Sequence, residues 1–499
     1  MTVPIATALA FSPIAVPALT AAGCALAGRR VAAVAGVVCA LAMEAAAIGL
    51  AVTVVASEPI EVAGLRLDAL SAFMLVVIGA VATIAALASP AHSATEVDAG
   101  RLSPRTARRQ GVLVHAFLAA MALAVLAADL GVVWVAVELT TIVTAFLVGQ
   151  GRTRNAVEAA WKYVVICSTG IALALLGLVL LNFAAAHAAT DAPGLDWAAL
   201  VAAAPALDPA VTQIAVVLLI VGFGTKAGLA PLHAWLPDAH GQAPAPVSAL
   251  MSGVLLAVSF SVILRVKVIS DGALGPGFAR ALLLGAALAS LLVATSLLLA
   301  QRDYKRMLAY SSIEQMGLLA LGAAVGGPAA TAAVLLHVLG HGLVKGVAFV
   351  GAGRLAQLTG TSRIDQVRGL ATMHPTLAAP LALAVLALLG LPPFSLFASE
   401  MAIVRAGLSG PDDRGLGWAV VAALVLVLVS GAAMLRHTGR MLLGPTAEEP
   451  PTLITRQRLP HTTRLALLGG LVVAAVLGVT TGPLTDLITQ AAHALSGAP

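Results

Sequence analysis

The stretch VGFGTKAGLAPLHAWLPDAHGQAPAPVSAL at residues 221–250 begins as an apolar helix and is then interrupted by four prolines. A second apolar stretch, LALLGLPPFSLFASE at residues 386–400, is interrupted by two adjacent prolines. Proline removes a backbone donor and clashes with the preceding turn, so we expect each helix to open. An ionisable residue stands beside each interruption, Lys226 before the first and Glu400 after the second. Interrupted helices in corresponding positions of two halves of a chain indicate a transport site.

The composition places these helices in a membrane. Of the 499 residues, 60% belong to the set AVILMFWYC and only 10% are charged, and the mean hydropathy is +1.00. A soluble domain carries roughly 25% charged residues, so this chain has too few polar groups to cover a globule. The net charge of +5 is spread over short loops and forms no basic run with interleaved aromatics, which argues against nucleic-acid binding.

We predict an all-α polytopic membrane protein, because lipid requires a backbone whose polar groups are satisfied internally. Apolar segments of about 18–25 residues recur along the chain. About fourteen transmembrane helices are predicted, at 5–27, 31–56, 69–89, 111–128, 130–149, 157–183, 212–232, 244–265, 279–300, 305–326, 328–353, 376–403, 416–435 and 463–482. The N-terminus lacks a basic region, so we interpret it as the first span and not as a cleaved signal. The tail at 483–496 is expected to be short and interfacial.

No cofactor or metal site is expected in this chain. The longest polar stretches, 90–110 and 437–462, are too short to hold a nucleotide or redox domain. Cys24, Cys39 and Cys167 lie in apolar segments without a C-x-x-C pair or a Cys/His cluster, which argues against a disulfide framework and a metal centre. Any redox chemistry that this protein serves is therefore expected on partner chains.

Ionisable residues occur where an apolar helix should carry none. They are Glu44, Glu138, Lys226, Glu314, His337, His341 and Lys345, with Glu400 beside a helix break. A charge at membrane depth costs at least about 2.5–3.5 kcal/mol on insertion scales. A chain that carries so many costly charges usually has an ion pathway, so we favour that function for these residues. The alternative is that they form structural ion pairs between buried helices. We expect Glu138 and Lys226 to form an exchangeable pair.

Three of these residues form a regular row in LLHVLGHGLVKGVAF, residues 335–349. The four-residue spacing of His337, His341 and Lys345 puts them on one helix face, about 6 Å apart along the axis. That distance suits one bridging water per gap, and histidine titrates near neutrality. We predict a proton wire. A structural histidine pair is the main alternative, and a metal site would need further ligands.

The order of the charges suggests an internal duplication. The first copy runs Glu138, Lys162 and Lys226, and the second runs Glu314, Lys345 and Glu400. With five helices in each copy, the second copy is inverted relative to the first, because five is odd. The predicted division is 1–110 for an N-terminal three-helix segment and cytoplasmic loop, 111–265 and 279–435 for the two repeats, and 436–499 for a cytoplasmic loop, the last helix and the tail.

The motifs together resemble a known family. They are VWVAVELTT around Glu138, FGTKAGLAPLHAWLPDAH with Lys226 and His240, DYKRMLAYSSIEQMG, LLHVLGHGLVKG and LPPFSLFASE. Residues 65–435 resemble the antiporter-like membrane subunits of respiratory complex I, of Mrp-type cation/proton antiporters and of membrane-bound hydrogenases. Within this family, the segments after Glu138 and around Glu314 are most similar to hydrogenase-4 component F.

The resemblance implies two inverted five-helix repeats, each with a broken helix, and redox chemistry on neighbouring subunits. It implies a proton pathway through Glu138, Lys162, Lys226, His240, Glu314, His337, His341, Lys345 and Glu400. The chain departs from many relatives in its eighth helix, where residues 247–265 offer no Lys or His before Arg265. Ser252, Ser259 and Ser261 are the polar candidates there, so water would have to carry the middle step.

We therefore expect a proton-translocating membrane subunit of a multi-subunit membrane-bound hydrogenase or a related respiratory oxidoreductase complex. The expected partners are other membrane subunits and a peripheral cytoplasmic redox arm, with protons as the transported ion and Na⁺ possible. The alternatives are an Mrp-type Na⁺/H⁺ antiporter subunit and a structural membrane anchor with a vestigial channel. The bacterial inner membrane is the expected location.

The distribution of Lys and Arg predicts the orientation of the chain. Odd-numbered loops carry twenty of these residues and even-numbered loops carry six, so the odd loops are expected in the cytoplasm and both termini outside. The loop after the eighth span disagrees, with Arg265, Lys267 and Arg280 on the outer side. Reporter fusions at residues 100 and 450 should both report a cytoplasmic position. An external signal from either fusion would overturn this orientation.

Overall fold

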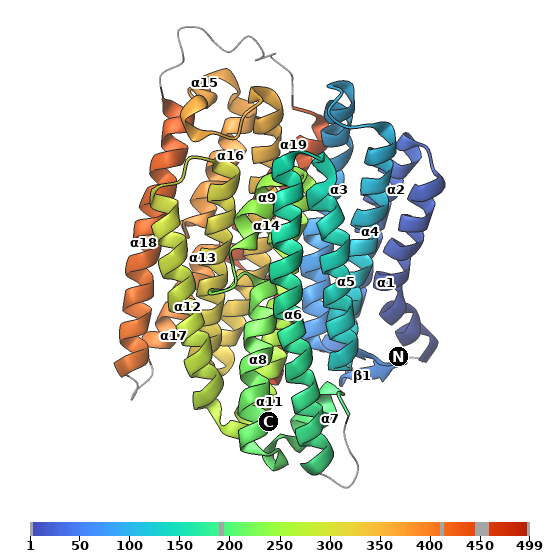
Figure 1. Ribbon diagram of the computed structural model, residues 1–499, viewed down its shortest axis with the longest axis vertical. Coiled ribbons are helices and arrows are strands. Elements are labelled where there is room, and N and C mark those ends of the chain that lie inside the picture. Colours follow the sequence, from blue (N-terminus) through green and yellow to red (C-terminus); the bar gives the residue numbers. More distant parts are fainter. Residues whose placement is uncertain (1–2, 189–193, 410–413, 445–458, 497–499) are drawn as a thin grey trace.

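The computed structural model describes residues 3–188, 194–409, 414–444 and 459–496, and it shows a tall bundle of helices (Figure 1). Within these ranges, thirteen helices are long and apolar enough to cross a membrane. The predicted all-α polytopic class is thereby confirmed. Of the fourteen predicted spans, the twelfth, 376–403, is not among these thirteen helices, because it is divided into two short helices.

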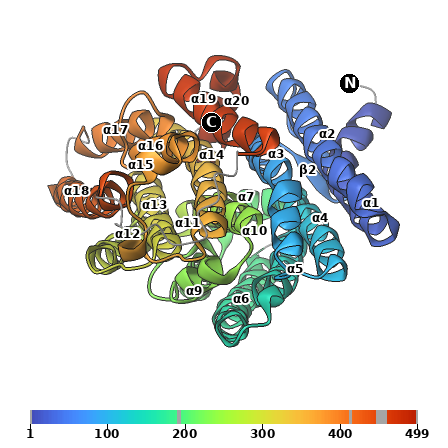
Figure 2. The same cartoon turned by 90° about the horizontal axis from the view of Figure 1, so that it is seen from above.

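The chain starts with a helical hairpin at one edge of the bundle, α1 (Val3–Leu26) and α2 (Arg29–Val55), shown in blue in Figure 2. A small antiparallel ribbon follows, in which β1 (Ile60–Val62) pairs with β2 (Leu65–Leu67). Both residues of its turn, Ala63 and Gly64, have positive φ. This pair lacks the Asn-Gly or Asp-Gly signature of such hairpins, so the ribbon is not evident from sequence. The long helix α3 (Ala69–Asp98) then enters the bundle.

Two sets of helices make up the body of the bundle. The first set consists of α4 (Pro104–Leu126), α5 (Leu130–Val148), α6 (Arg154–Ala188), the short α7 (Trp197–Ala203), α8 (Pro209–Ala227), α9 (Trp235–Gln242), α10 (Ala245–Leu250) and α11 (Leu256–Leu274). The second set consists of α12 (Pro276–Leu299), α13 (Tyr304–Val325), α14 (Gly327–Thr359), the short α15 (Leu370–Met373), α16 (Pro375–Leu388), α17 (Ser395–Leu408) and α18 (Arg414–Leu443). A π-helical segment at Met251–Leu255 joins α10 to α11.

Two further helices complete the described chain. They are α19 (His461–Val479) and α20 (Thr485–Leu495). The tail helix α20 buries one apolar face, with Leu487, Ile488 and Leu495 inside, against α3 and α14. The tail is therefore short, as predicted, and it is docked on the bundle.

Both predicted helix breaks are present. Helix α8 ends at Ala227 and α9 begins at Trp235, and the peptide bond between Ala230 and Pro231 is cis. Helix α16 ends at Leu388 and α17 begins at Ser395, after a cis peptide bond between the two prolines. Figure 1 places α8 below α9 and α16 above α17, so the two broken helices run in opposite directions through the bundle.

Gly228 shows why the first break needs glycine. Its φ of +79° lies in the left-handed region, which L side chains rarely adopt. A Cβ atom at this position would also lie 2.5 Å from Cδ1 of Leu236. Glycine at residue 228 therefore lets the helix end shortly after Lys226 without strain.

The opposite course of the broken helices agrees with the predicted inversion. In both sets, the broken helix is the fourth of five long elements. The division of the chain at residues 110, 265 and 435 stays a prediction. Helix α11 continues past the predicted limit of its repeat to Leu274, and α12 begins directly afterwards.

Helix α14 lies near the centre of the bundle (Figure 2). It packs against α3, α10, α13, α16, α17, α19 and α20, and nearly all of its side chains from Val334 to Leu355 are buried. Helices α11 and α13 are almost as deeply buried. The predicted row of histidines and lysine therefore lies in the middle of the molecule and not on a face towards lipid.

Ion pairs with aspartates hold two of the basic residues that disagreed with the predicted orientation of the chain. Arg265 lies within α11, where its guanidinium donates to Asp68 at 3.0 and 3.1 Å. Trp197 of α7 packs against Arg265, with 4.6 Å from the guanidinium carbon to the ring centroid. Lys267 pairs with Asp271 one turn further along the helix. Two of the three basic residues that were expected on the outer side are thus paired with aspartates.

Asp68→Asn should destabilise the fold, because it leaves the Arg265 guanidinium buried without its anion. Loss of one partner from a buried pair costs about 3–5 kcal/mol. Thermal unfolding of the solubilised protein should therefore show a clear drop in melting temperature. The matched control is Asp365→Asn, which breaks an exposed pair with Arg363 and should leave the melting temperature nearly unchanged. An unchanged melting temperature for Asp68→Asn would show that the pair with Arg265 does not stabilise the fold.

The same pair gives the direction of a pH effect. Burial alone would raise the pKa of the Asp68 carboxyl, but Arg265, the Ser71 amide and Arg66 outweigh burial and hold the pKa below its usual value. A carboxyl with a lowered folded pKa stabilises the fold above its unfolded pKa, about 3.9, and the stabilisation is lost as the pH falls through the folded pKa. The difference between wild type and Asp68→Asn should stay constant down to about pH 4 and shrink below it.

Candidate functional site

Lys226 lies in the last turn of α8, directly before the first helix break. Its side chain is completely buried. The ammonium donates to the Thr141 hydroxyl at 2.7 Å and to the Tyr163 hydroxyl at 2.5 Å. Within the described ranges, the lysine ion pairs are those of Lys162 and Lys267, so Lys226 is held by neutral oxygens alone.

Glu138 lies on α5, one turn before Thr141. One of its carboxylate oxygens accepts a hydrogen bond from Ser168 at 3.1 Å, and the other is buried with no protein partner among the described residues. The expected contact between Glu138 and Lys226 is not formed in this structure. The Thr141 hydroxyl, which accepts from the lysine, stands one helical turn from the carboxylate.

Lys345 has the same kind of surroundings in the second set of helices. It lies in the middle of α14, is completely buried, and donates to the Leu308 carbonyl at 2.7 Å and to the Ser311 hydroxyl. Glu314 follows Ser311 on α13 by one turn and accepts a hydrogen bond from Ser430 of α18. Each lysine is thus bound to a hydroxyl, and a glutamate bonded to serine stands one turn from that hydroxyl.

His337 and His341 precede Lys345 on the same face of α14. Nδ1 of His337 lies 3.0 Å from the Ser399 hydroxyl of α17. The other ring nitrogen of His337 and both nitrogens of His341 are buried without a partner in the part of the chain that the structure describes. Buried polar atoms are nearly always hydrogen-bonded, and water commonly supplies the partner. The row therefore has the polar atoms that water molecules need.

Glu400 lies near the start of α17, after the second break. Its carboxylate is packed against Gly390, where a Cβ atom would come within 2.1 Å of Oε2. Gly390 also has a positive φ of 61°, so the close approach and the turn both require glycine. Glu400 follows Ser399, the neighbour of His337, directly in sequence. The end of the histidine row thus contacts the same helix, α17, that carries Glu400.

His240 connects the surroundings of the two lysines. It lies on α9 between Trp235 and Phe349, with ring centroids 6.2 and 5.2 Å away. Trp235 in turn packs edge-on against Tyr163 at 5.0 Å, and Tyr163 binds Lys226. Phe349 stands one turn beyond Lys345 on α14. Both ring nitrogens of His240 are buried and unpaired within the described residues.

The eighth predicted helix, which lacks a charge in its middle, contributes a serine. Ser252 lies in the π-helical segment, and its hydroxyl is 2.8 Å from that of Ser312. Ser312 directly follows Ser311, which binds Lys345. Of the other two candidates, Ser259 has no partner among the described residues, and Ser261 donates to its own helix. The hydroxyl of Ser252 therefore links this helix to α13 beside the serine that binds Lys345.

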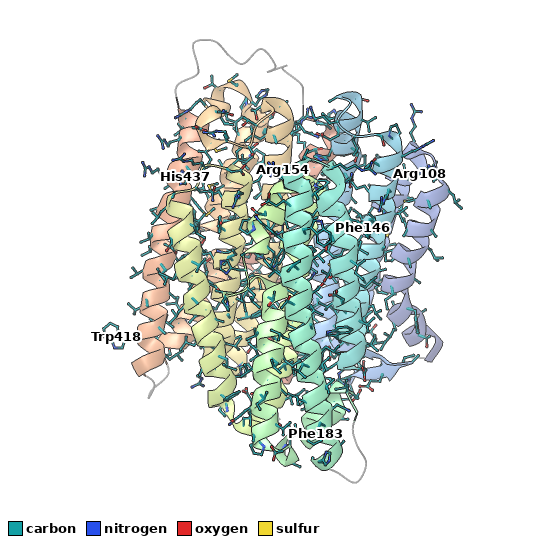
Figure 3. The ribbon with its side chains drawn as sticks, in the orientation of Figure 1. Arg108, Phe146, Arg154, Phe183, Trp418 and His437 are labelled. Carbon is teal, nitrogen blue, oxygen red and sulfur yellow. The ribbon has the colours of Figure 1, made fainter. Side chains whose placement is uncertain are left out.

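Lys162 lies apart from these buried groups. Its side chain is 47% exposed and forms ion pairs with Glu158 at 2.8 Å and Asp238 at 3.0 Å. Asp238 also pairs with Arg306 of α13 at 3.1 Å. This network ties α6, α9 and α13 together near the end of the bundle that carries Arg154 in Figure 3. The duplication pattern placed Lys162 on the pathway, and the structure places it at an exposed end.

Lys305 is a structural residue that the sequence patterns did not reveal. It begins α13 in the motif DYKR, which is most simply interpreted as a cytoplasmic anchor. In the structure, its ammonium donates to the carbonyls of Gly241 and Ala243 at 2.8 and 3.3 Å. These carbonyls belong to the end of α9 and the link to α10. Lys305 therefore stabilises the far side of the first helix break.

The backbones of α14 and the π-helical segment touch at two glycines. A Cβ atom at Gly342 would lie 2.8 Å from the Gly253 carbonyl, and a Cβ at Gly253 would lie 2.8 Å from the Gly342 carbonyl. A backbone atom cannot move aside as the end of a side chain can. The contact lies next to His341 and three residues before Lys345. It therefore fixes where these side chains lie along the axis of α14 relative to the π-helical segment.

Gly342→Ala should therefore separate the two helices and displace Lys345 from Ser311. We expect a fall in melting temperature equivalent to about 1–3 kcal/mol, the usual cost of overpacking. Gly346→Ala is the matched control on the same helix, because its Cβ would meet only Ile84 and Val81 side-chain atoms at 3.4–3.6 Å. If both variants melt at the same temperature, the glycine contact does not position this helix.

Comparisons with known proteins agree with the fold and the motifs. The family described as "NADH:quinone oxidoreductase/Mrp antiporter, TM" matches residues 127–430. The hydrogenase-4 component F homolog of Methylacidiphilum infernorum (isolate V4) is 38% identical over 352 residues, 70% of this chain and 73% of the relative. NADH-quinone oxidoreductase subunit N of Desulforudis audaxviator (strain MP104C) is 37% identical over 330 residues, 65% of this chain and 63% of the relative.

A solved structure has the same fold along the whole chain. A chain of the membrane-bound sulfane sulfur reductase, an archaeal respiratory membrane complex, superposes with a TM-score of 0.85 at 24% identity, covering 99% of this chain and 98% of that chain. The family match spans both helix breaks and both buried lysines. The chain belongs to the family of NADH:quinone oxidoreductase and Mrp antiporter transmembrane subunits.

Proposed function

We propose that this chain is a proton-translocating membrane subunit of a multi-subunit membrane-bound hydrogenase or a related respiratory oxidoreductase complex. One observation carries the proposal. Lys226 and Lys345 are completely buried in the bundle, and each is bound to neutral oxygens. A glutamate stands one helical turn from the hydroxyl that holds each lysine.

This arrangement suits a lysine that changes its charge during a transport cycle. Desolvation disfavours an ammonium that has no nearby anion, whereas a carboxylate at close range favours it. A glutamate at a distance of one turn can approach the lysine by rotation of its side chain. Approach and withdrawal of Glu138 and Glu314 would then load and unload the two lysines. A purely structural ion pair would hold the charges together permanently.

The proposed route uses the residues that the bundle brings together. Protons would pass from Glu138 and Lys226 along the side of Tyr163, Trp235 and His240 towards Lys345. The second part would run along His341 and His337 to Glu400. The orphan nitrogens of the histidines are positions for bridging water, which can carry a proton between groups too far apart for direct transfer. Ser252 would support the middle of this route, and Lys162 would lie outside it.

The coupled electron transfer would take place on partner subunits. The names of the two relatives, a hydrogenase-4 component and a subunit of NADH-quinone oxidoreductase, support an assembly with redox partners. We propose other membrane subunits and a peripheral cytoplasmic redox arm as those partners. We also propose a bacterial cell membrane and an outside position for both termini, which the pairing of Arg265 and Lys267 with aspartates supports.

A sodium–proton antiporter subunit is the second candidate. The family includes Mrp antiporters, and carbonyls freed at a helix break can coordinate Na⁺. The row on α14 favours protons, because the nitrogens of histidine and lysine carry protons and are poor ligands for a hard cation. Na⁺ transport is therefore the alternative function, and a measurement that distinguishes Na⁺ flux from H⁺ flux has to separate the two.

Lys345→Arg tests the proposed role of a lysine that releases its proton. Guanidinium keeps its proton in proteins, so we expect the complex to retain electron transfer but to lose at least about tenfold in proton pumping, which is about 1.4 kcal/mol. Lys345→Ala should fail as badly. Proton uptake per electron transferred, measured with the native complex in proteoliposomes, checks both variants.

Lys162→Arg is the matched control, because arginine can keep the exposed ion pairs with Glu158 and Asp238. This variant should pump at close to the wild-type rate. If Lys345→Arg pumps like wild type, Lys345 is a fixed charge and the proposed wire is wrong.

A further inference from the structure

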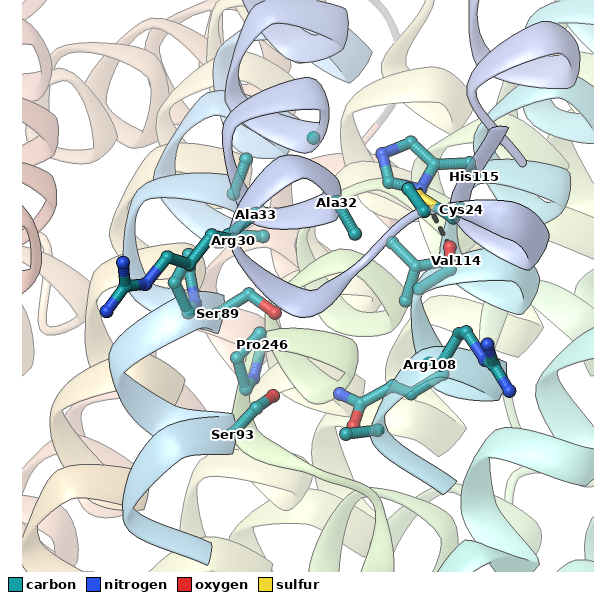
Figure 4. A pocket seen from close by; sticks show the side chains of 18 of the residues that line it. Cys24, Arg30, Ala32, Ala33, Ser89, Ser93, Arg108, Val114, His115 and Pro246 are labelled. Carbon is teal, nitrogen blue, oxygen red and sulfur yellow. Dashed lines mark hydrogen bonds between the residues drawn. The ribbon is translucent and has the colours of Figure 1, made fainter. Parts of the chain in front are cut away.

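A cavity lies outside the proposed ion pathway, between the α1–α2 hairpin and helices α3 and α4 (Figure 4). Its volume is about 540 Å³, within the usual range of about 300–1,000 Å³ for small-molecule sites. Small residues form much of its wall, among them Ala33 and Gly36 of α2, Ala82 and Ala85 of α3, and Gly111 of α4. Pro246 and Leu250 of α10 close its inner side. The result is a largely apolar slot.

Three arginines line this slot, and Arg30 and Arg108 stand on opposite sides of it (Figure 4). Arg30, Arg105 and Arg108 line it, and no acidic residue is among its described lining residues. In the described part of the chain, none of these three arginines forms an ion pair. In Figure 4, Arg30 and Arg108 flank the cavity, with Ser93 and Pro246 between them. Helix α2 also starts here, and its N-cap is Gly28, so its first amide groups lack a side-chain partner.

Gln110 provides an independent sign that the cavity is made for an occupant. This residue of α4 lines the cavity and is only 3% exposed. Its side-chain oxygen accepts a hydrogen bond from Gln150 at 3.0 Å, whereas its amide nitrogen has no acceptor among the described residues. Buried donors in proteins nearly always have an acceptor. An oxygen atom of a bound molecule would satisfy this amide.

We infer that the cavity binds one anionic phospholipid from the adjoining leaflet of the membrane. The phosphate group would lie among Arg30, Arg105 and Arg108, and the Gln110 amide would donate to a phosphate or ester oxygen. One acyl chain would follow the wall of alanines and glycines. Basic pockets between transmembrane helices are a recognised form of anionic lipid site.

The lining of the cavity favours a lipid over a helix of a partner subunit. It combines arginines, which suit a phosphate group, with a wall of small apolar residues, which suits an acyl chain. The outer face of α2 exposes the apolar side chains of Val31, Val34 and Val38. A free phosphate ion would use the arginines but leave the apolar slot empty. The inference stands apart from the ion pathway and does not depend on the proposed function.

The test measures lipid retained by the native complex, purified in mild detergent and weighed by native mass spectrometry. The complex is first depleted of lipid and then offered mixed micelles of phosphatidylglycerol or of phosphatidylcholine. We expect one phosphatidylglycerol to bind at least tenfold more tightly than phosphatidylcholine. The double variant Arg30→Gln/Arg108→Gln should lower its occupancy at least tenfold.

Two further variants make the result specific. Ala33→Leu keeps all the charges but fills the slot, and it should also lose the lipid. Arg154→Gln/Arg302→Gln removes the same charge from exposed positions elsewhere and should retain it. Electron transfer by each complex confirms its assembly.

Three outcomes would overturn the inference: retention of the lipid by both cavity variants, equal binding of phosphatidylcholine or a neutral quinone, or displacement of the lipid by millimolar inorganic phosphate.

Discussion

Water is absent from the interior of a bilayer, so every polar group there must find its partner within the protein. Helix α14 shows how this chain meets the constraint. Its neighbours bury it on all sides, the Gly253–Gly342 contact brings the π-helical segment against it, and α13 supplies a carbonyl and a hydroxyl to Lys345. His337 and His341 of α14 keep ring nitrogens without a partner among the described residues. The most constrained helix of the bundle thus also carries buried nitrogens that can still bind a proton or a water molecule.

The glycines and serines explain how a helix without a charge in its middle can still serve the site. Gly253 lets the two backbones meet, and Ser252 then reaches Ser312, the neighbour of the hydroxyl that holds Lys345. π-helical segments inside longer helices frequently occur at functional sites. The π-helical segment thus has two effects. It lets α14 pack closely at Gly253, and it brings the hydroxyls of Ser252 and Ser312 together. A larger residue at either glycine would disturb both together.

The helix breaks and the row on α14 could be predicted because their causes are local. Clustered prolines favour the opening of a helix, and four-residue spacing places side chains on one face. The partners of Lys226 could not be predicted, because Thr141 and Tyr163 come from two other helices. The exposure of Lys162 could not be predicted either, because a long side chain two turns into α6 can extend to the polar boundary; its place on the pathway stays a prediction. Arg265 was assigned to a loop because the aspartate that permits its burial precedes it by 197 residues.

The central claim is that protons, moved by this chain, cross the membrane when partner subunits transfer electrons. The most direct test is the pH change inside proteoliposomes that contain the native complex, driven by its electron donor in sodium-free potassium buffer. The account predicts a pH gradient that forms without Na⁺, collapses with a protonophore and is unchanged when Na⁺ is added. A gradient that forms only after Na⁺ is supplied, or electron transfer without any pH change, would contradict it.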